Sequence, residues 1–285
     1  MEKNRYYVSI ADVSIGIKTD FDVLIGQEGE QFFCRESIPT NIKNDISFNI
    51  QKTNNPLIMG NKIFDEDEFF IYETEFGFTR QFTSIISKKP YAWLTPYNEY
   101  NYNLSYLSGR EEDFKYSKNI LEGINIESIL NRFILHSSFI NWQNNGILFS
   151  APSGTGKSTQ ADLWNKQENA EIINGDRAGV RNVDGVWSAY GLPVAGSSGI
   201  YKNKKAQISH IIVLRQGTEN KLTRLSPRDA FIKIYSETTV HTWDDEFQNN
   251  ILNMISDLVQ NVPVYLYECL PDESAVEFLK EQIIK

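Results

Sequence analysis

Residues 146–159 read Gly-Ile-Leu-Phe-Ser-Ala-Pro-Ser-Gly-Thr-Gly-Lys-Ser-Thr, an apolar run followed directly by a glycine-rich turn. The apolar run has the length and character of a buried strand, and the residues from Thr159 to Lys166 are compatible with a helix. A strand that enters a Gly-x-Gly-Lys-Ser turn and continues as a helix is the usual setting of a phosphate-binding loop. The stretch therefore predicts an α/β fold with a nucleotide site at this turn.

Each residue type in the turn suits phosphate chemistry. Gly154 and Gly156 allow the backbone to curl so that successive N–H groups point at a phosphate, and the following helix adds its positive N-terminal end. Lys157 can reach the β- and γ-phosphate oxygens, and the Ser158 hydroxyl is the expected Mg²⁺ ligand. Ala151 replaces the glycine that usually opens the pattern, so its φ must be negative. The predicted ATP-binding residues are Ser153, Gly154, Thr155, Gly156, Lys157, Ser158 and Thr159.

The composition limits the class of protein. The chain has 285 residues, of which 41% are hydrophobic and 23% charged, and this balance predicts a packed core. A net charge of −9 argues against a nucleic-acid partner. The two cysteines, Cys34 and Cys269, are too far apart in sequence to suggest a disulfide framework or a thiolate metal site. A polar start and the lack of a membrane-length apolar run lead us to expect a cytoplasmic protein with no membrane partner.

The pattern of the chain changes along its length. Residues 1–118 contain short apolar or alternating runs and dense aromatic residues, which predict a β-rich N-terminal domain. Residues 119–285 alternate strand-like and helix-like segments, which predict an α/β domain built on a mixed sheet with flanking helices. Within it, residues 134–140 and 146–150 are expected to pair around a turn at Asn144 and Asn145. Ser226 and Pro227 are expected to begin a helix.

Asp176 is the first acid that ends a predicted strand after the loop. Ligands of open α/β sheets bind at the carboxyl ends of strands, so Asp176 is a candidate metal ligand or proton acceptor for phosphate transfer. The alternative is an aspartate that caps a local turn. Several basic residues are candidates to neutralise phosphate charge, namely Lys202, Lys204, Lys205, Arg215, Arg224 and Arg228.

Three segments together resemble the catalytic domain of HPr kinase/phosphorylase, which shares its nucleotide-binding core with PEP carboxykinase. They are Leu135-His136, residues 146–158, and Asn174-Gly-Asp-Arg, with His136 at the interval from Lys157 that the family keeps. The resemblance covers roughly residues 130–285. It implies a P-loop PEP carboxykinase-like fold and a Mg-ATP-dependent serine kinase. Asp176, His136 and Lys157 would be its catalytic residues, Ser158 and Asp176 would hold Mg²⁺, and relatives are often homo-oligomers.

The chain departs from that family at two places. Gly175 stands where relatives carry the first of two aspartates, and residues 191–199 lack the acid and arginine of the family's Glu-x-Arg-Gly segment. The N-terminal half also differs from the regulatory domain of the phosphotransfer enzyme. The whole chain is more similar to HPr-kinase-related proteins of peptide modification, such as lasso-peptide kinases. This favours a serine on a peptide or small protein, including a ribosomal precursor peptide, as the acceptor.

Two other functions remain open from the sequence. One is a kinase that acts on the hydroxyl of a small molecule, for which a closed pocket would be suitable. The other is a non-catalytic nucleotide-binding module, which the reduced set of acids favours.

Overall fold

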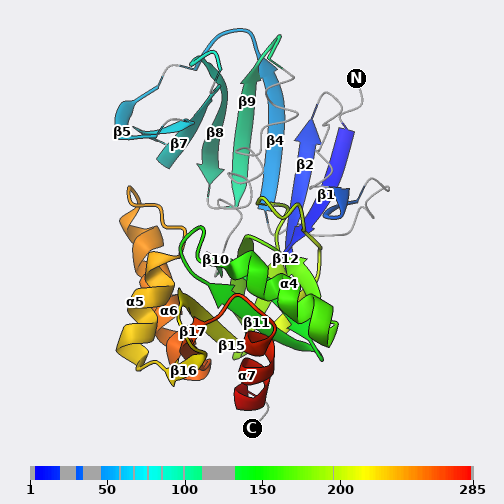
Figure 1. Ribbon diagram of the computed structural model, residues 1–285. Coiled ribbons are helices and arrows are strands. Elements are labelled where there is room, and N and C mark those ends of the chain that lie inside the picture. The colour runs from blue at the N-terminus through cyan, green and yellow to red at the C-terminus, as the bar shows by residue number, and fades with distance from the viewer. Residues whose placement is uncertain are drawn as a thin grey trace. The chain divides into compact units, whose positions relative to one another are not determined.

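The computed structural model describes residues 4–19, 30–34, 46–110 except 58, 67, 76, 85 and 99, and 132–283 except 195 (Figure 1). The chain divides into two compact units, Met1–Ile129 and Leu130–Lys285. The domain boundary predicted between residues 118 and 119 lies outside the described residues, as does a strand-like run at residues 22–25. In the part that the structure covers, none of the helices combines the length and apolar composition needed to cross a membrane.

The described residues of the first unit form a nine-stranded sheet in the order β3-β1-β2-β4-β9-β8-β7-β6-β5. Strand β4 pairs in parallel with β2 and β9, and the other neighbours are antiparallel. Trp93 is fully buried, and its indole N–H donates to Gln81 Oε1 at 3.0 Å. The strands are β1 (Asn4–Ile10), β2 (Val13–Thr19), β3 (Phe33–Cys34), β4 (Ile46–Thr53), β5 (Asn61–Asp65), β6 (Phe69–Thr74), β7 (Gly77–Thr83), β8 (Pro90–Asn98) and β9 (Asn101–Leu107).

The second unit contains a mixed sheet and, among its described residues, four helices. Its strands are β10 (Arg132–Trp142), β11 (Asn145–Ser150), β12 (Glu171–Asn174), β13 (Arg177–Val183), β14 (Val186–Gly191), β15 (Lys205–Gln216), β16 (Lys221–Arg224) and β17 (Val264–Cys269). Its helices are α4 (Lys157–Glu168), α5 (Pro227–Ser236), α6 (Asp245–Asn261) and α7 (Ser274–Ile283). The α/β class predicted from the sequence is therefore confirmed, while the PEP carboxykinase-like detail stays a prediction.

Five strands of this sheet form a closed circuit of pairings. Strand β10 pairs with β11 and β13, β13 pairs with β14, β14 pairs with β15, and β15 pairs in parallel with β11. Strand β15 also pairs in parallel with β17, which carries β16. Strand β11, which leads into the predicted phosphate loop, therefore has a neighbour on each side.

The β10–β11 hairpin differs by one residue from the expectation. Gln143 and Asn144 form its turn, both with positive φ, and Asn145 already pairs with Trp142 as the first residue of β11. A two-residue turn with two positive φ values matches the right-handed twist of the strands. The pattern of two apolar runs around Asn144-Asn145 predicts the turn at these residues, but the register places Gln143 in the turn and Asn145 in the strand.

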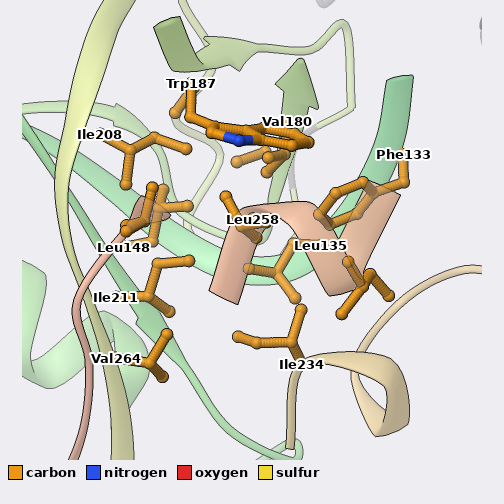
Figure 2. Close-up of a cluster of buried hydrophobic side chains, with 14 of the residues drawn as sticks. Phe133, Leu135, Leu148, Val180, Trp187, Ile208, Ile211, Ile234, Leu258 and Val264 are labelled. Carbon is orange, nitrogen blue, oxygen red and sulfur yellow. The ribbon is translucent and has the colours of Figure 1, made fainter. Parts of the chain in front are cut away.

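Alternate side chains of β11 face two separate apolar clusters. Leu148 packs in a cluster that includes Ile234 of α5 and Leu258 of α6 (Figure 2). Ile147 and Phe149 belong to a second cluster formed with α4 and α7. A strand covered by helices on both faces is apolar at nearly every position, which explains the run Ile-Leu-Phe. Helices on opposite faces thus hold β11 and the turn that follows it.

The start of α5 is as predicted. Ser226 is its N-cap, with Oγ accepting from the Asp229 backbone N–H at 3.2 Å, and Pro227 occupies the first turn. Serine followed by proline suits these positions because the cap supplies an acceptor and proline needs no partner for a missing N–H.

Candidate functional site

The loop between β11 and α4 has the backbone of an anion site. Gly154 and Gly156 have φ values of 79° and 117°, and a Cβ at either position would meet no atom within 4 Å. Glycine is therefore required here by backbone conformation rather than by space. Gly156 caps α4 without a side-chain hydrogen bond, and the first turn of α4 carries no acid. The first N–H groups of α4 and its positive dipole end are thus available to a phosphate.

The other predicted ATP ligands surround this turn. Ser153, Ser158 and Thr159 are exposed, and Thr155 is half-buried. Ala151 is buried and is not among the residues with positive φ, as its replacement of glycine requires.

Lys157 folds back over the loop. Its Nζ donates to Ala151 O at 2.7 Å and to Pro152 O at 3.3 Å, and only 7% of the residue is exposed. Burial lowers the pKa of Lys157, and the negative charges of Glu237 and Asp176 oppose this shift. The lysine therefore lies within electrostatic range of two carboxylates. A phosphate oxygen can take the place of these carbonyl oxygens as the acceptor from Lys157 Nζ.

Asn174 fixes the turn that carries Asp176. Its Oδ1 accepts from the backbone N–H groups of Asp176 and Arg177, both at 2.9 Å. Its Nδ2 donates to Leu192 O at 3.1 Å and to Val194 O at 2.9 Å. Asn174 is 0% exposed, so its two bonds to the carbonyls are shielded from water. The Asn174 amide therefore determines where the Asp176 backbone lies.

Strand β10 supplies further contacts to the same turn. Ser138 Oγ donates to Gly175 O at 2.9 Å, and the Ser137 backbone N–H donates to Asp176 O at 3.0 Å. The Asp176 turn is thus bound to β10 as well as to the segment after β14.

The structure brings His136 and Asp176 together. His136 on β10 is paired in register with Arg177 at the start of β13. His136 Nε2 lies 3.6 Å from Asp176 Oδ1, and Arg177 Nε lies 3.5 Å from Asp176 Oδ2. All three side chains are roughly a quarter to a third exposed, so solvent and substrate can reach them. Asp176 is thus flanked by a histidine and an arginine beside the phosphate loop.

Glu237 is a further acid of this site that the sequence analysis missed. Its Oε2 lies 3.0 Å from His136 Nδ1, and its side chain is only 12% exposed. Glu237 is the C-cap of α5, a position where the helix dipole disfavours a negative charge. The unusual acid at a helix C-cap was the only local sign that Glu237 has a role in the site, because 101 positions separate Glu237 from His136.

Two residues of the segment 191–199, Gly196 and Ser198, lie against the turn that carries Asp176. A Cβ at Gly175 would lie 2.0 Å from Ser198 Oγ, so Ser198 occupies the space that an aspartate at this position would need. A Cβ at Gly196 would lie 2.6 Å from Asp176 Cγ. The glycine- and serine-rich segment therefore packs against the Asp176 turn and is part of the site.

Several of the basic candidates have other partners. Lys202 and Lys204 bind Glu171 at 2.8 and 2.7 Å, and these two contacts lower the pKa of the Glu171 carboxyl. Arg215 binds Glu268 at 2.6 Å. The structure therefore assigns the cation beside Asp176 to Arg177 rather than to these residues.

Comparisons with family models, curated proteins and solved structures do not show the family of this chain. No family model matches the chain, and no curated protein is similar to it. Among solved structures, the chain is similar to the Hpr(Ser) kinase/phosphatase from Coxiella burnetii, with a TM-score of 0.29 and 11% identity. The similarity covers 53% of this chain and 92% of that chain.

The donor set suits a magnesium ion that binds together with a nucleotide. No group of three or more His, Cys, Asp or Glu side chains among the described residues is placed to hold a metal. Mg²⁺, however, usually binds through one or two protein ligands, the phosphates of its substrate and several waters. The exposed Ser158 hydroxyl and the accessible Asp176 carboxylate are oxygen ligands of this kind.

Replacing Gly196 with Ala should displace the Asp176 carboxyl. If the site transfers phosphate from ATP, as the sequence predicts, transfer should slow while ATP binding is kept. The added methyl group would overlap the Asp176 carboxyl and displace it, and a shift of about 1 Å at a reacting group costs about 100-fold in rate. Transfer is measured with labelled ATP, and binding is measured by calorimetry. Ser197→Ala, an exposed position in the same segment, is the matched control. A transfer rate in Gly196→Ala equal to that of the unmodified protein would show that the rate does not depend on the exact position of the Asp176 carboxyl.

Proposed function

We propose that this protein is a Mg-ATP-dependent kinase that phosphorylates a serine hydroxyl on a peptide or small protein. One observation carries the proposal: Asp176, fixed by Asn174, lies against His136, whose backbone carbonyl accepts a hydrogen bond from Ser150 at the start of the phosphate loop. A nucleotide cradle beside a positioned carboxylate is what phosphate transfer to a hydroxyl requires. The cradle alone would serve any nucleotide-binding protein.

The chain's residues have separate roles in this reaction. The loop N–H groups and Lys157 bind the triphosphate. Ser158 and Asp176 would hold Mg²⁺, which would neutralise phosphate charge. Asp176 accepts the proton of the serine hydroxyl as the serine oxygen bonds to the γ-phosphorus. The bond between that phosphorus and the β–γ bridging oxygen breaks, and ADP leaves. Arg177, 3.5 Å from Asp176, adds positive charge at the site.

A nucleotide-binding module without catalysis is the second candidate. It is favoured by the absence, among the described residues, of a cluster of acids that could hold a metal without help from the nucleotide. Such a module would use the loop and Lys157 in the same way. It would bind ATP and transfer nothing.

Labelled ATP tests these proposals directly. The protein is incubated with Mg²⁺, γ-labelled ATP and three acceptors: a serine-containing peptide pool, the same pool with alanine for serine, and free serine. Label on the serine pool alone is the expected result. Label on free serine would point instead to a small-molecule kinase. ATP binding with no labelled product on any acceptor would favour the non-catalytic module.

Replacing Lys157 with Met should weaken Mg-ATP binding about tenfold to a hundredfold, the value of one hydrogen bond from a charged donor. Calorimetric titration with Mg-ATP measures the change. Lys166→Met, an exposed change on the same helix, is the control and should bind as the unmodified protein does. Equal affinity in Lys157→Met and Lys166→Met would contradict a nucleotide site at this loop.

A further inference from the structure

We infer that Glu237 is a positioning residue that fixes the ring of His136, and through it the carboxylate of Asp176. The contact itself is independent of any activity, but its effect on rate rests on the proposed kinase function. The chain of contacts runs from Glu237 Oε2 to His136 Nδ1 at 3.0 Å and from His136 Nε2 to Asp176 Oδ1 at 3.6 Å. The imidazole thus lies between two carboxylates, of which Glu237 is the more buried.

The backbone around Glu237 is held to β10 by hydrogen bonds. The His136 N–H donates to Glu237 O at 2.8 Å, and the Thr239 N–H donates to Ile134 O at 3.0 Å. Leu135 and Thr238 form an antiparallel bridge between these two bonds. Strand β11 covers this edge of β10 only from Trp142 to Ser137, so residues 237–239 pair with β10 where β11 has ended. Glu237 is therefore placed by strand pairing rather than by a free loop.

The shorter of the two contacts selects the tautomer of His136. An ionised carboxylate only accepts hydrogen bonds, so the proton in the 3.0 Å Glu237 contact belongs to His136 Nδ1. The second ring nitrogen, Nε2, lies 3.6 Å from Asp176 Oδ1, which is beyond hydrogen-bond distance, so this contact does not require a proton on Nε2. Ser150 Oγ also donates to His136 O at 3.1 Å, which holds the histidine backbone next to the phosphate loop. Ring, tautomer and backbone are thus all constrained.

The placement of Glu237 is unfavourable for α5 itself. A negative charge at a helix C-cap opposes the helix dipole, and lysine or arginine is the usual choice there. A carboxylate that is nearly buried and aimed at a histidine needs a compensating interaction, and His136 Nδ1 supplies it. The contact therefore serves to orient His136 and does not stabilise α5.

Three variants test the role of Glu237. An amide can accept or donate, so Glu237→Gln keeps the shape of the side chain and releases the constraint on the tautomer. Glu237→Asp keeps an acceptor-only group and should recover most of the lost effect. Glu277→Gln, on the exposed face of α7, is the control. Thermal unfolding of all three shows whether each remains folded.

The first readout is nitrogen-15 NMR of the histidine rings, with His136 assigned by comparison with His136→Gln. The unmodified protein, Glu237→Asp and Glu277→Gln should show the Nδ1–H tautomer at His136, and Glu237→Gln should show a mixture. The same tautomer in Glu237→Gln and in the unmodified protein would overturn the inference whether or not the protein is a kinase.

The second readout is the kinetics of phosphate transfer. In Glu237→Gln we expect kcat to fall about tenfold to a hundredfold, with KM for ATP unchanged. An effect of this size is seen at metal sites when a histidine loses the partner that orients its ring. A change in KM with kcat intact would mean that Glu237 serves nucleotide binding and would overturn the inference. If the unmodified protein transfers no phosphate but shows the expected tautomers, the proposed function fails and the positioning role stands.

Discussion

Replacing Asp176 with Asn is expected to lower phosphate transfer by about 10²- to 10⁴-fold, the usual contribution of a general base, while ATP still binds. Asparagine has the size of aspartate but cannot accept the hydroxyl proton. The backbone bonds from Asp176 and Arg177 to Asn174 do not involve the substituted group, so the turn should keep its shape. Initial rates on the best serine acceptor and calorimetric ATP binding measure the two effects separately.

Asp184→Asn is a matched control for this experiment. Asp184 is exposed in the β13–β14 turn with φ 51°, a conformation that asparagine adopts readily. It should change neither rate nor affinity. A transfer rate in Asp176→Asn equal to that of the control would rule out the proposed mechanism, and equal loss of transfer and of ATP affinity would assign Asp176 to nucleotide binding alone.

Replacing Asn174 with Asp is expected to reduce the free energy of unfolding by about 3–5 kcal/mol, the cost of an uncompensated buried charge. The new oxygen would face the carbonyls of Leu192 and Val194, which now accept from Nδ2 at 3.1 and 2.9 Å. Two attractive contacts would become repulsive in a position that is 0% exposed. The change in shape is negligible, so charge and hydrogen bonding are tested without a cavity.

Denaturant unfolding followed by circular dichroism measures this loss. Asn249→Asp, an exposed substitution of the same kind on α6, should leave the midpoint nearly unchanged. If the two variants unfold at the same denaturant concentration, Asn174 does not organise the site as the contacts indicate. Any folded fraction of Asn174→Asp should also transfer phosphate poorly, because the Asp176 turn has lost its anchor.

The sequence pattern predicted the strands and helices whose formation depends mainly on residues close to one another in the sequence. The strand before the loop, the helix after it and the Ser226–Pro227 start of α5 are each set by neighbours in the sequence, and each was found. Strand β13 was not anticipated, because Arg177–Val183 alternates only weakly and gains its stability from β10 and β14. The hairpin turn was misplaced by one residue because register depends on the partner strand.

The candidate site could be predicted in part. The loop follows from its own motif, Asp176 from its place after a predicted strand, and His136 from the resemblance to HPr kinase/phosphorylase. The structure places His136 Nε2 3.6 Å from Asp176 Oδ1. Glu237 could not be found in this way, since nothing local links the end of α5 to β10. The close approaches of Gly196 to Asp176 and of Ser198 to Gly175 are likewise tertiary contacts that no spacing rule reports.

The closed circuit of strands has a consequence for the order in which the site forms during synthesis. Strand β10 precedes β11 directly, so half of the support for the phosphate loop can pair early. The parallel neighbour, β15, leaves the ribosome much later, and the segment with Glu237 follows it. Contacts distant in sequence form slowly because a long loop must close first. A nascent chain that ends before Lys205 should therefore contain the Gly-Lys-Ser turn without the parallel neighbour of β11, and the contact between Glu237 and His136 can form only after α5 has been made.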